Sequence, residues 1–231
     1  MGAATEHVAA EVGETVTSRA TFGGVRLALA TVCVIALIGR YIWGLGAVTY
    51  LPGNFFAYLT IQSNIAFVVV SLVAGVVALR HGRDPRWLTN VRSGVLTGTV
   101  SSGVVFAVLL QQAGARGFAM YVSWSDLVLH FWLPAFALIE WFSTPGRDRA
   151  QWRVTWFVLV FVVGWGIVTL IRGAIVGWYP YFFLDPNQVS GIGELAGLSA
   201  IALVFFAAIS VAISAVTRRR PLFEKVGETS F

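Results

Sequence analysis

Charged residues are scarce in this sequence. Asp, Glu, Lys and Arg make up only 12% of its 231 residues, whereas about a quarter of the residues in soluble domains are charged. Hydrophobic residues make up 57%, and the mean hydropathy is +0.78. A folded surface in water needs more polar groups than this, so the composition excludes a soluble globular domain and indicates an integral membrane protein.

Residues that commonly hold cofactors are also few. Cys33 is the only cysteine, which excludes a disulfide framework and a cysteine metal cluster. Lys225 is the only lysine and follows the last apolar run, so no retinal Schiff base can form among the helices. Only one histidine, His130, lies within an apolar run, which excludes bis-histidine haem ligation. We therefore expect neither a cofactor nor a metal.

Six apolar runs are present, each near the ~20 residues that cross a bilayer. They cover Val25 to Gly46, Phe55 to Leu79, Val91 to Leu110, Tyr121 to Phe142, Val154 to Trp178 and Ile192 to Val216. Backbone groups in lipid must pair within their own segment, so runs of this length predict helices. The predicted fold is all-α: a disordered cytoplasmic tail over residues 1–22, a bundle of six transmembrane helices over 23–217, and a basic cytoplasmic tail over 218–231.

The distribution of arginine predicts the orientation. All but three of the 16 Lys and Arg residues lie on one side of the predicted membrane, and the three exceptions are Arg40, Arg116 and Arg172. Cytoplasmic loops are enriched in Lys and Arg, so both termini are predicted in the cytoplasm. The formal charge of +5 follows this loop pattern, and we therefore expect no nucleic-acid partner. The predicted location is a cell membrane, of the bacterial plasma membrane type.

Polar residues within the apolar runs are the candidates for function, because ionisable side chains are costly to bury in hydrocarbon. With this orientation they gather in the outer half and the outer loops, and the inner half holds only Glu140. A channel would need polar lining along its whole length. The sequence therefore predicts a polar pocket that opens to the outer leaflet.

Two pairs of residues can share this pocket. Thr60 and Asn64 lie one turn apart in the second run, as do Asp126 and His130 in the fourth. We expect Asp126 to orient the imidazole and to favour its charged form. A histidine held structurally by a neighbouring helix is an equally good interpretation of His130, and Thr60 alone is typical of a hydroxyl bonded to its own helix.

Further candidates lie in and after the fifth run. Arg172 is always charged, so it must reach water or find an anion. We expect a salt bridge to Asp126, Asp185 or Glu194, with a clamp for a substrate carboxylate as the alternative. The segment Trp178-Tyr-Pro-Tyr-Phe-Phe-Leu-Asp-Pro186 brings Tyr179 and Tyr181 to the outer interface, where it can cover an acyl chain.

Three motifs carry a family resemblance. They are Phe56-Ala-Tyr-Leu-Thr60, His130-Phe-Trp-Leu-Pro134 followed by Ile139-Glu140, and Trp178-Tyr-Pro-Tyr-Phe-Phe-Leu-Asp185. In their order and in the spans that hold them, they resemble the signatures of the androgen-induced-protein family of six-span intramembrane threonine hydrolases. The continuation Ile61-Gln-Ser-Asn64 is similar to the family's prokaryotic, actinobacterial-type branch, and Asp126 stands where animal members have Asn.

The resemblance implies an activity. Animal members hydrolyse fatty acid esters of hydroxy fatty acids, with a threonine nucleophile and a histidine at positions that match Thr60 and His130. A carboxylic ester hydrolase of this kind needs an oxyanion donor, for which Asn64 and Ser63 are the candidates. A lipid-binding or small-molecule transport protein that uses the same pocket is the alternative. Membrane lipids are the expected partners, with a fatty acyl ester as substrate, and the sequence leaves the oligomeric state open.

The orientation can be tested by labelling. A reporter fused after Phe231 should be cytoplasmic, and cysteines placed at Gln112 or Asn187 should react with impermeant thiol reagents from outside the cell. The opposite pattern of labelling would contradict the predicted orientation and would move the pocket to the cytoplasmic leaflet.

Overall fold

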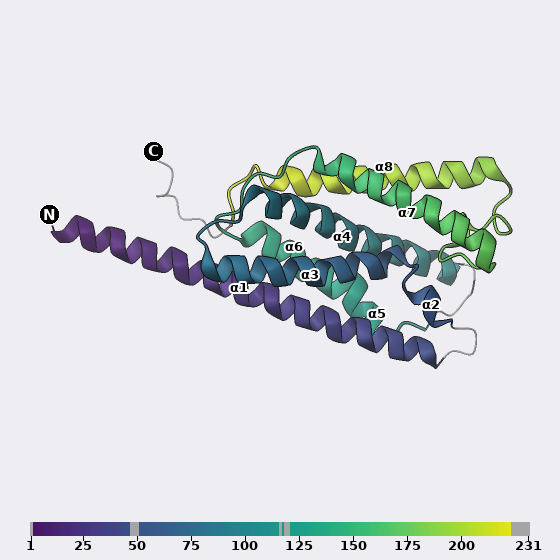
Figure 1. Ribbon diagram of the computed structural model, residues 1–231, viewed down its shortest axis with the longest axis horizontal. Coiled ribbons are helices and arrows are strands. Elements are labelled where there is room, and N and C mark those ends of the chain that lie inside the picture. The colour runs from purple at the N-terminus through teal and green to yellow at the C-terminus, as the bar shows by residue number, and fades with distance from the viewer. Residues whose placement is uncertain (1, 47–50, 116, 118–120, 223–231) are drawn as a thin grey trace.

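The computed structural model describes residues 2–46, 51–115, 117 and 121–222, with side chains from Arg19 onward. In this part of the chain every regular element is helical (Figure 1). The long helices are α1 (Gly2–Leu45), α3 (Leu59–Arg80), α4 (Arg86–Ala115), α7 (Val154–Val176) and α8 (Ile192–Val216). Short elements are α2 (Pro52–Phe55) and the 3₁₀ turn η2 (Phe182–Leu184). The all-α prediction is confirmed.

Among the described residues, five helices are long and apolar enough to cross a membrane. They are Arg19–Leu45 within α1, and α3, α4, α7 and α8. Three of them, α3, α7 and α8, agree with the predicted runs to within about a turn, whereas α4 is longer at both ends and the span in α1 begins six residues before the predicted Val25. Each exposes large apolar side chains, as a helix facing lipid does.

The predicted fourth run has a different local structure. α5 (Trp124–Leu127), a π-turn η1 (Val128–Trp132) and α6 (Leu133–Ser143) follow one another without a gap. Pro134 explains the interruption, because it has no backbone N–H to donate to the carbonyl of His130 four residues earlier. The N–H of Leu133 instead bonds to the carbonyl of Val128, five residues back, which defines the wider turn.

The tails differ from expectation or lie outside the description. α1 begins at Gly2, so the stretch 2–22, which was predicted to be disordered, is part of a helix that projects beyond the bundle (Figure 1). Alanines at positions 3, 4, 9 and 10 favour this helical structure. Of the basic tail, residues 223–231 lie outside the described residues, as does Arg116.

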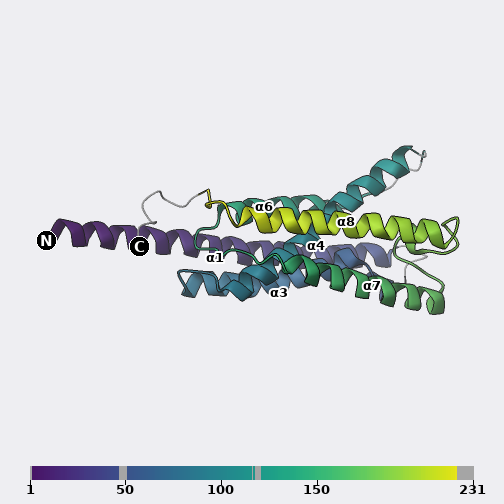
Figure 2. The ribbon, with the colours of Figure 1, turned by 90° about the horizontal axis from the view of Figure 1, so that it is seen from above.

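Close packing brings α1 and α3 together. A Cβ built on Gly23 of α1 would press against the Leu79 side chain and the carbonyl of Gly75 in α3, and one on Gly75 would press against Leu27. Small residues at such points let two membrane helices approach closely. α7 and α8 form a separate pair on the opposite side of the bundle (Figures 1 and 2). A hydrogen bond between the hydroxyls of Thr155 and Ser210 joins α7 to α8, and one between the hydroxyls of Ser93 and Ser214 joins α4 to α8.

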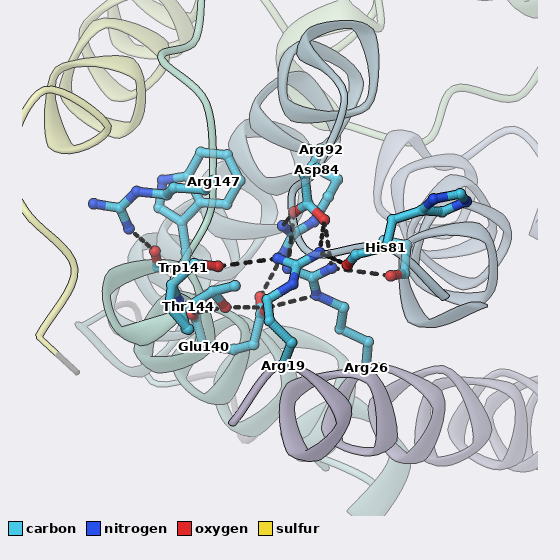
Figure 3. Close-up of polar contacts among 11 residues, drawn as sticks. Arg19, Arg26, His81, Asp84, Arg92, Glu140, Trp141, Thr144 and Arg147 are labelled. Atoms are coloured by element: carbon cyan, nitrogen blue, oxygen red, sulfur yellow. Dashed lines mark hydrogen bonds and ion pairs between the residues drawn. The ribbon is translucent and has the colours of Figure 1, made fainter. Parts of the chain in front are cut away.

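A cluster of buried charges ties the other helices together at one end of the bundle (Figure 3). Its members come from α1, the α3–α4 connection, α4 and α6: Arg19, Arg26, Asp84, Arg92 and Glu140. We call this set the ion cluster. Each member is 8% exposed or less.

The contacts of the ion cluster are close. Asp84 accepts from Arg19 at 2.7 Å, from Arg26 at 3.0 Å and from Arg92 at 2.9 Å. Glu140 accepts from Arg26 at 2.7 Å and from Arg92 at 2.5 Å. Three guanidinium groups thus share two carboxylates. Backbone carbonyls of Pro145 and Ala74 accept further hydrogen bonds from the cluster's arginines.

The expected distribution of intramembrane charge was therefore wrong. We expected the polar residues in the outer half, with Glu140 alone near the inner boundary, and we counted Arg19, Arg26 and Arg92 with the loops. The structure buries all three arginines against Asp84 and Glu140. The reason is that a charge in an apolar core must be paired, and the partners come from elements that are distant in the chain.

The ion cluster makes stability depend on pH through Asp84. Burial alone would raise the pKa of this carboxyl, but the charges of Arg26, Arg92 and Arg19 outweigh it and lower the pKa from 3.8 to about 2. A carboxyl with a lowered folded-state pKa stabilises the fold above its unfolded pKa. That contribution, about 2 kcal/mol, should therefore be present above pH ~4 and lost as the pH falls towards 2.

Thermal unfolding of purified protein in detergent measures this effect. Asp84→Asn leaves three arginines with one carboxylate and should destabilise the protein by about 3 to 5 kcal/mol at neutral pH. Asp84→Asn should also lose less stability than the wild type as the pH falls from about 4 towards 2, because it has no carboxyl at this position to protonate. Arg86→Gln is a matched control, because its pair with Asp148 is exposed and worth little. Equal effects of the two substitutions would contradict the importance of the cluster.

Candidate functional site

A cavity of about 250 Å³ lies between the helices at the end of the bundle away from the ion cluster. Residues from α1, α3, α4, the α5–η1 segment and the α7–α8 connection surround it. Its polar lining consists of Arg40, Tyr58, Thr60, Ser102, Asp126, His130 and Tyr181. Its apolar lining includes Phe55, Ile61, Val105, Phe106, Leu109 and Leu129. We call it the outer cavity, after the predicted orientation. A mostly apolar wall with a few polar groups is typical of a site for an amphiphilic molecule.

His130 enters this cavity from the π-turn. Such turns are rare and often occur at functional sites. The backbone of α4 passes very close to the turn, because a Cβ built on Gly103 would overlap the carbonyl oxygen of His130. This carbonyl is also the one that Pro134 leaves without its usual helical donor. The absence of a side chain at Gly103 therefore allows α4 to approach the backbone of the π-turn at His130.

The ring of His130 has a defined orientation. It stacks on Phe106 with the ring centroids 3.9 Å apart and the planes at 14°. Its Nδ1 lies 2.9 Å from the backbone carbonyl oxygen of Asp126. A carbonyl can only accept, so Nδ1 must carry the proton. In the neutral ring Nε2 is then the unprotonated nitrogen, which is the form that can act as a base.

Asp126 orients the ring through its backbone rather than its side chain. We expected its carboxylate to contact the imidazole. Instead Oδ1 pairs with Nε of Arg40 at 2.8 Å, and Oδ2 accepts from the Ser123 hydroxyl at 2.8 Å in a capping box at the start of α5. The carboxylate therefore fixes the helix start that carries His130, and Arg40 neutralises its charge.

Thr60 lies in the first turn of α3 and lines the same cavity as His130. Its hydroxyl is 3.5 Å from the hydroxyl of Tyr181, which comes from the aromatic segment between α7 and α8. Burial raises the pKa of the Tyr181 phenol, so this group stays neutral at physiological pH. Within the described part of the chain, no hydrogen bond joins Thr60 to His130 directly.

The two candidate oxyanion donors do not line the cavity. The Asn64 amide donates to the backbone carbonyl of Thr60 at 2.9 Å, and the Ser63 hydroxyl donates to the same oxygen at 3.0 Å. Asn64 is fully buried and also lies beside Cys33. Both side chains support the backbone beneath Thr60, and neither is placed to contact a molecule in the cavity.

The predicted salt bridge of Arg172 was wrong. Its guanidinium donates to the side-chain oxygen of Asn54 at 2.6 Å and lies over the ring of Trp178. Among the described residues it forms no ion pair with Asp126, Asp185 or Glu194. The reason is that Asp126 already belongs to Arg40, while a neutral amide on the nearby helix α2 satisfies Arg172 without a second charge.

The other predicted substrate-binding residues take different positions. Tyr181 lines the outer cavity, whereas Tyr179 packs against α7 at Gly173, where a Cβ would overlap its ring. Asp185 accepts hydrogen bonds from Asn187 and Gln188 in an exposed turn. Glu194 accepts from the backbone and hydroxyl of Ser190 before α8. Of these, only Tyr181 is placed to touch a molecule in the cavity.

Sequence reasoning missed several residues of the site. Arg40 was recognised as an outer polar residue but was given no role, and Tyr58, Ser102 and Phe106 were not considered. A signal existed for Arg40, because an arginine within an apolar run needs a partner, and Asp126 is an acid at a similar predicted depth. Tyr58 and Phe106 are typical apolar-run residues and gave no such signal.

Comparison of the chain with protein-family models, with curated proteins and with solved structures finds no match. The family resemblance therefore stays a prediction that rests on the three motifs. No group of three or more His, Cys, Asp or Glu gathers as metal ligands within the described residues.

The contact between Gly103 and the π-turn can be tested by Gly103→Ala. The new methyl group would overlap the His130 carbonyl, so the turn must move, and we expect a loss of about 1 to 3 kcal/mol in unfolding free energy. Gly114→Ala near the C-terminal end of α4 is the control, since its Cβ would meet open space. Thermal unfolding of both variants in detergent measures the difference, and equal stability would contradict the contact.

Proposed function

We propose that this chain is a six-span integral membrane protein with both ends in the cytoplasm. The consecutive elements α5, η1 and α6, from Trp124 to Ser143, together have the length for one more crossing, which makes six. Contacts at the ion-cluster end support an even number of crossings. Arg19 of α1 donates to the carbonyl of Pro145, and Arg147 donates to the carbonyl of Val216 at the end of α8. The start of the apolar part of α1 and the end of α8 thus both contact the connection between α6 and α7, which places them at the same end of the bundle.

For its activity, we propose intramembrane hydrolysis of a fatty acyl ester, with Thr60 as nucleophile and His130 as base. The observation that carries this proposal is that one cavity contains both residues, with Nδ1 of His130 bonded to a carbonyl and Nε2 left as the acceptor. A threonine hydroxyl is a weak nucleophile and needs such a base. The family resemblance at the same two positions adds support.

The reaction would run in two steps. Nε2 of His130 accepts the hydroxyl proton of Thr60 as Thr60 Oγ1 attacks the ester carbonyl carbon, and the proton then passes to the alcohol as it leaves. Water attacks the acyl-threonine in the second step, with His130 again accepting and returning the proton. Before the first step the Thr60 hydroxyl must turn from Tyr181 towards His130. Catalytic hydrogen bonds are often longer in the free enzyme than in the substrate complex.

The lining favours an acyl substrate. The aromatic and aliphatic wall of the outer cavity suits a hydrocarbon chain, while the polar groups Arg40, Tyr58 and Tyr181 lie where an ester head can reach them. Membrane lipid would supply such a molecule directly from the outer leaflet.

A specific observation favours a second function, which is lipid binding without hydrolysis. The Thr60 hydroxyl lies next to Tyr181 rather than His130, and the Asn64 and Ser63 donors are engaged by the Thr60 carbonyl. In a binding protein these contacts would simply hold the wall of the cavity.

Labelling and kinetics separate the two functions. The purified protein should react with a fluorophosphonate probe and hydrolyse a long-chain ester, and both activities should be lost in Thr60→Ala and in His130→Ala. Nucleophile and base act as a unit, so the double variant should be hardly slower than either single variant. Thr60→Ser, which keeps the hydroxyl, is the matched control and should retain part of the activity.

The opposite result is equally clear. An intact, folded protein that neither reacts with the probe nor hydrolyses esters would contradict the proposed reaction. Additive losses of ligand affinity at Thr60 and His130 would then identify two independent contacts in a binding pocket.

A further inference from the structure

Arg40, which lines the outer cavity, carries a hydrogen-bond donor that has no partner in the described structure. Arg40 lines the cavity from α1, and its Nη1 is buried from solvent without a hydrogen-bond acceptor in the described structure. The same guanidinium uses its Nε to bind Asp126. A buried donor of this kind is costly unless something accepts from it, because it has lost water and gained nothing in return.

The rest of the guanidinium is held in place. Nε donates to Asp126 Oδ1 at 2.8 Å, and the group lies 4.8 Å from the centre of the Trp43 ring. The side chain is 22% exposed, so it is partly shielded from water. Asp126 is held in turn by Ser123. A planar guanidinium fixed at one edge presents its other N–H groups in a defined direction.

The geometry points to Arg40 as the donor that binds the oxyanion of the reaction. This inference rests on the proposed function and deepens it. The predicted donors, Asn64 and Ser63, are engaged by the Thr60 carbonyl, whereas Arg40, whose Nη1 has no partner among the described residues, lines the same cavity as Thr60 and His130. A cationic donor in a shielded site stabilises a developing negative charge more than a neutral one does.

In this step Arg40 acts only as a hydrogen-bond donor. When Thr60 Oγ1 bonds to the ester carbon, the π electrons of the carbonyl move to its oxygen, and Nη1–H of Arg40 donates a hydrogen bond to that oxygen. Arg40 transfers no proton, because its guanidinium stays charged at any pH the protein survives. The oxygen returns to a carbonyl when the alcohol leaves.

Kinetics provide the first test. The ester 4-nitrophenyl decanoate is offered to the wild type and to Arg40→Gln in detergent. An interaction made mainly with the oxyanion predicts a fall in kcat of about 10²- to 10³-fold with little change in KM. Asp126→Asn is the matched control, because it breaks the Arg40 ion pair but keeps the guanidinium, and the Asn side-chain oxygen can still accept from Ser123 at the helix start that carries His130. If Arg40 acted only by holding Asp126, the control would lose as much activity as Arg40→Gln.

Binding gives a second test that needs no reaction. In the Thr60→Ala background, titration of the protein with decylphosphonate and with decanol compares an anionic head with a neutral one on the same chain. The anion should bind more tightly than the alcohol, and Arg40→Gln should reduce that preference by about tenfold to a hundredfold. If Arg40→Gln does not fold, Arg40→Gln combined with Asp126→Asn removes both charges and leaves neither unpaired.

The outcomes distinguish the two proposals. An active wild type with unchanged kcat in Arg40→Gln overturns the role of Arg40 and keeps the hydrolase. An inactive wild type that still binds the phosphonate through Arg40 overturns the hydrolase and supports Arg40 as an anion donor. A wild type without activity and without preference for the anion overturns both.

Discussion

The need to pair buried charge is the constraint on which the bundle depends. Arg26 and Arg92 lie within apolar helices, so each must find a carboxylate, and the same two carboxylates serve both. This requirement fixes α1, the α3–α4 connection, α4 and α6 against one another at one end. α1 and α4 carry Arg40 and Phe106 at the other end, and the adjoining elements α3 and η1 carry Thr60 and His130. A rigid ion cluster thus provides the precision that a catalytic or binding cavity needs.

Much of the fold could be predicted from the sequence, because helix formation in lipid follows from the length of an apolar run. The shared cavity of Thr60 and His130 was also within reach, since both lie at a similar depth in their runs. The contacts were not. Arg26 and Glu140 are 114 residues apart in the chain, and nothing local indicates that they meet. Asn64 had the right spacing to face the cavity, but its amide bonds to its own helix four residues back.

The arginines have two roles, of which the sequence pattern indicates only one. Lys and Arg near one membrane surface indicate orientation, whatever those residues do after folding. Here Arg19, Arg26 and Arg92 contribute to that count and also form the ion cluster, whereas Arg147 and Arg218 bind backbone carbonyls near the end of α8. The same residues can therefore serve both insertion and packing, and counting them as loop charge hides the second role.

The π-turn has a consequence for how this helix should be compared with others. It accommodates one residue more than an α-helical turn, so it acts as a phase shift between α5 and α6. A helical wheel drawn through Trp124–Ser143 at 3.6 residues per turn cannot place both halves correctly. Alignments of this segment to an uninterrupted helix will match Asp126 or Glu140 to the right face, but not both, unless a gap of one residue is allowed near His130.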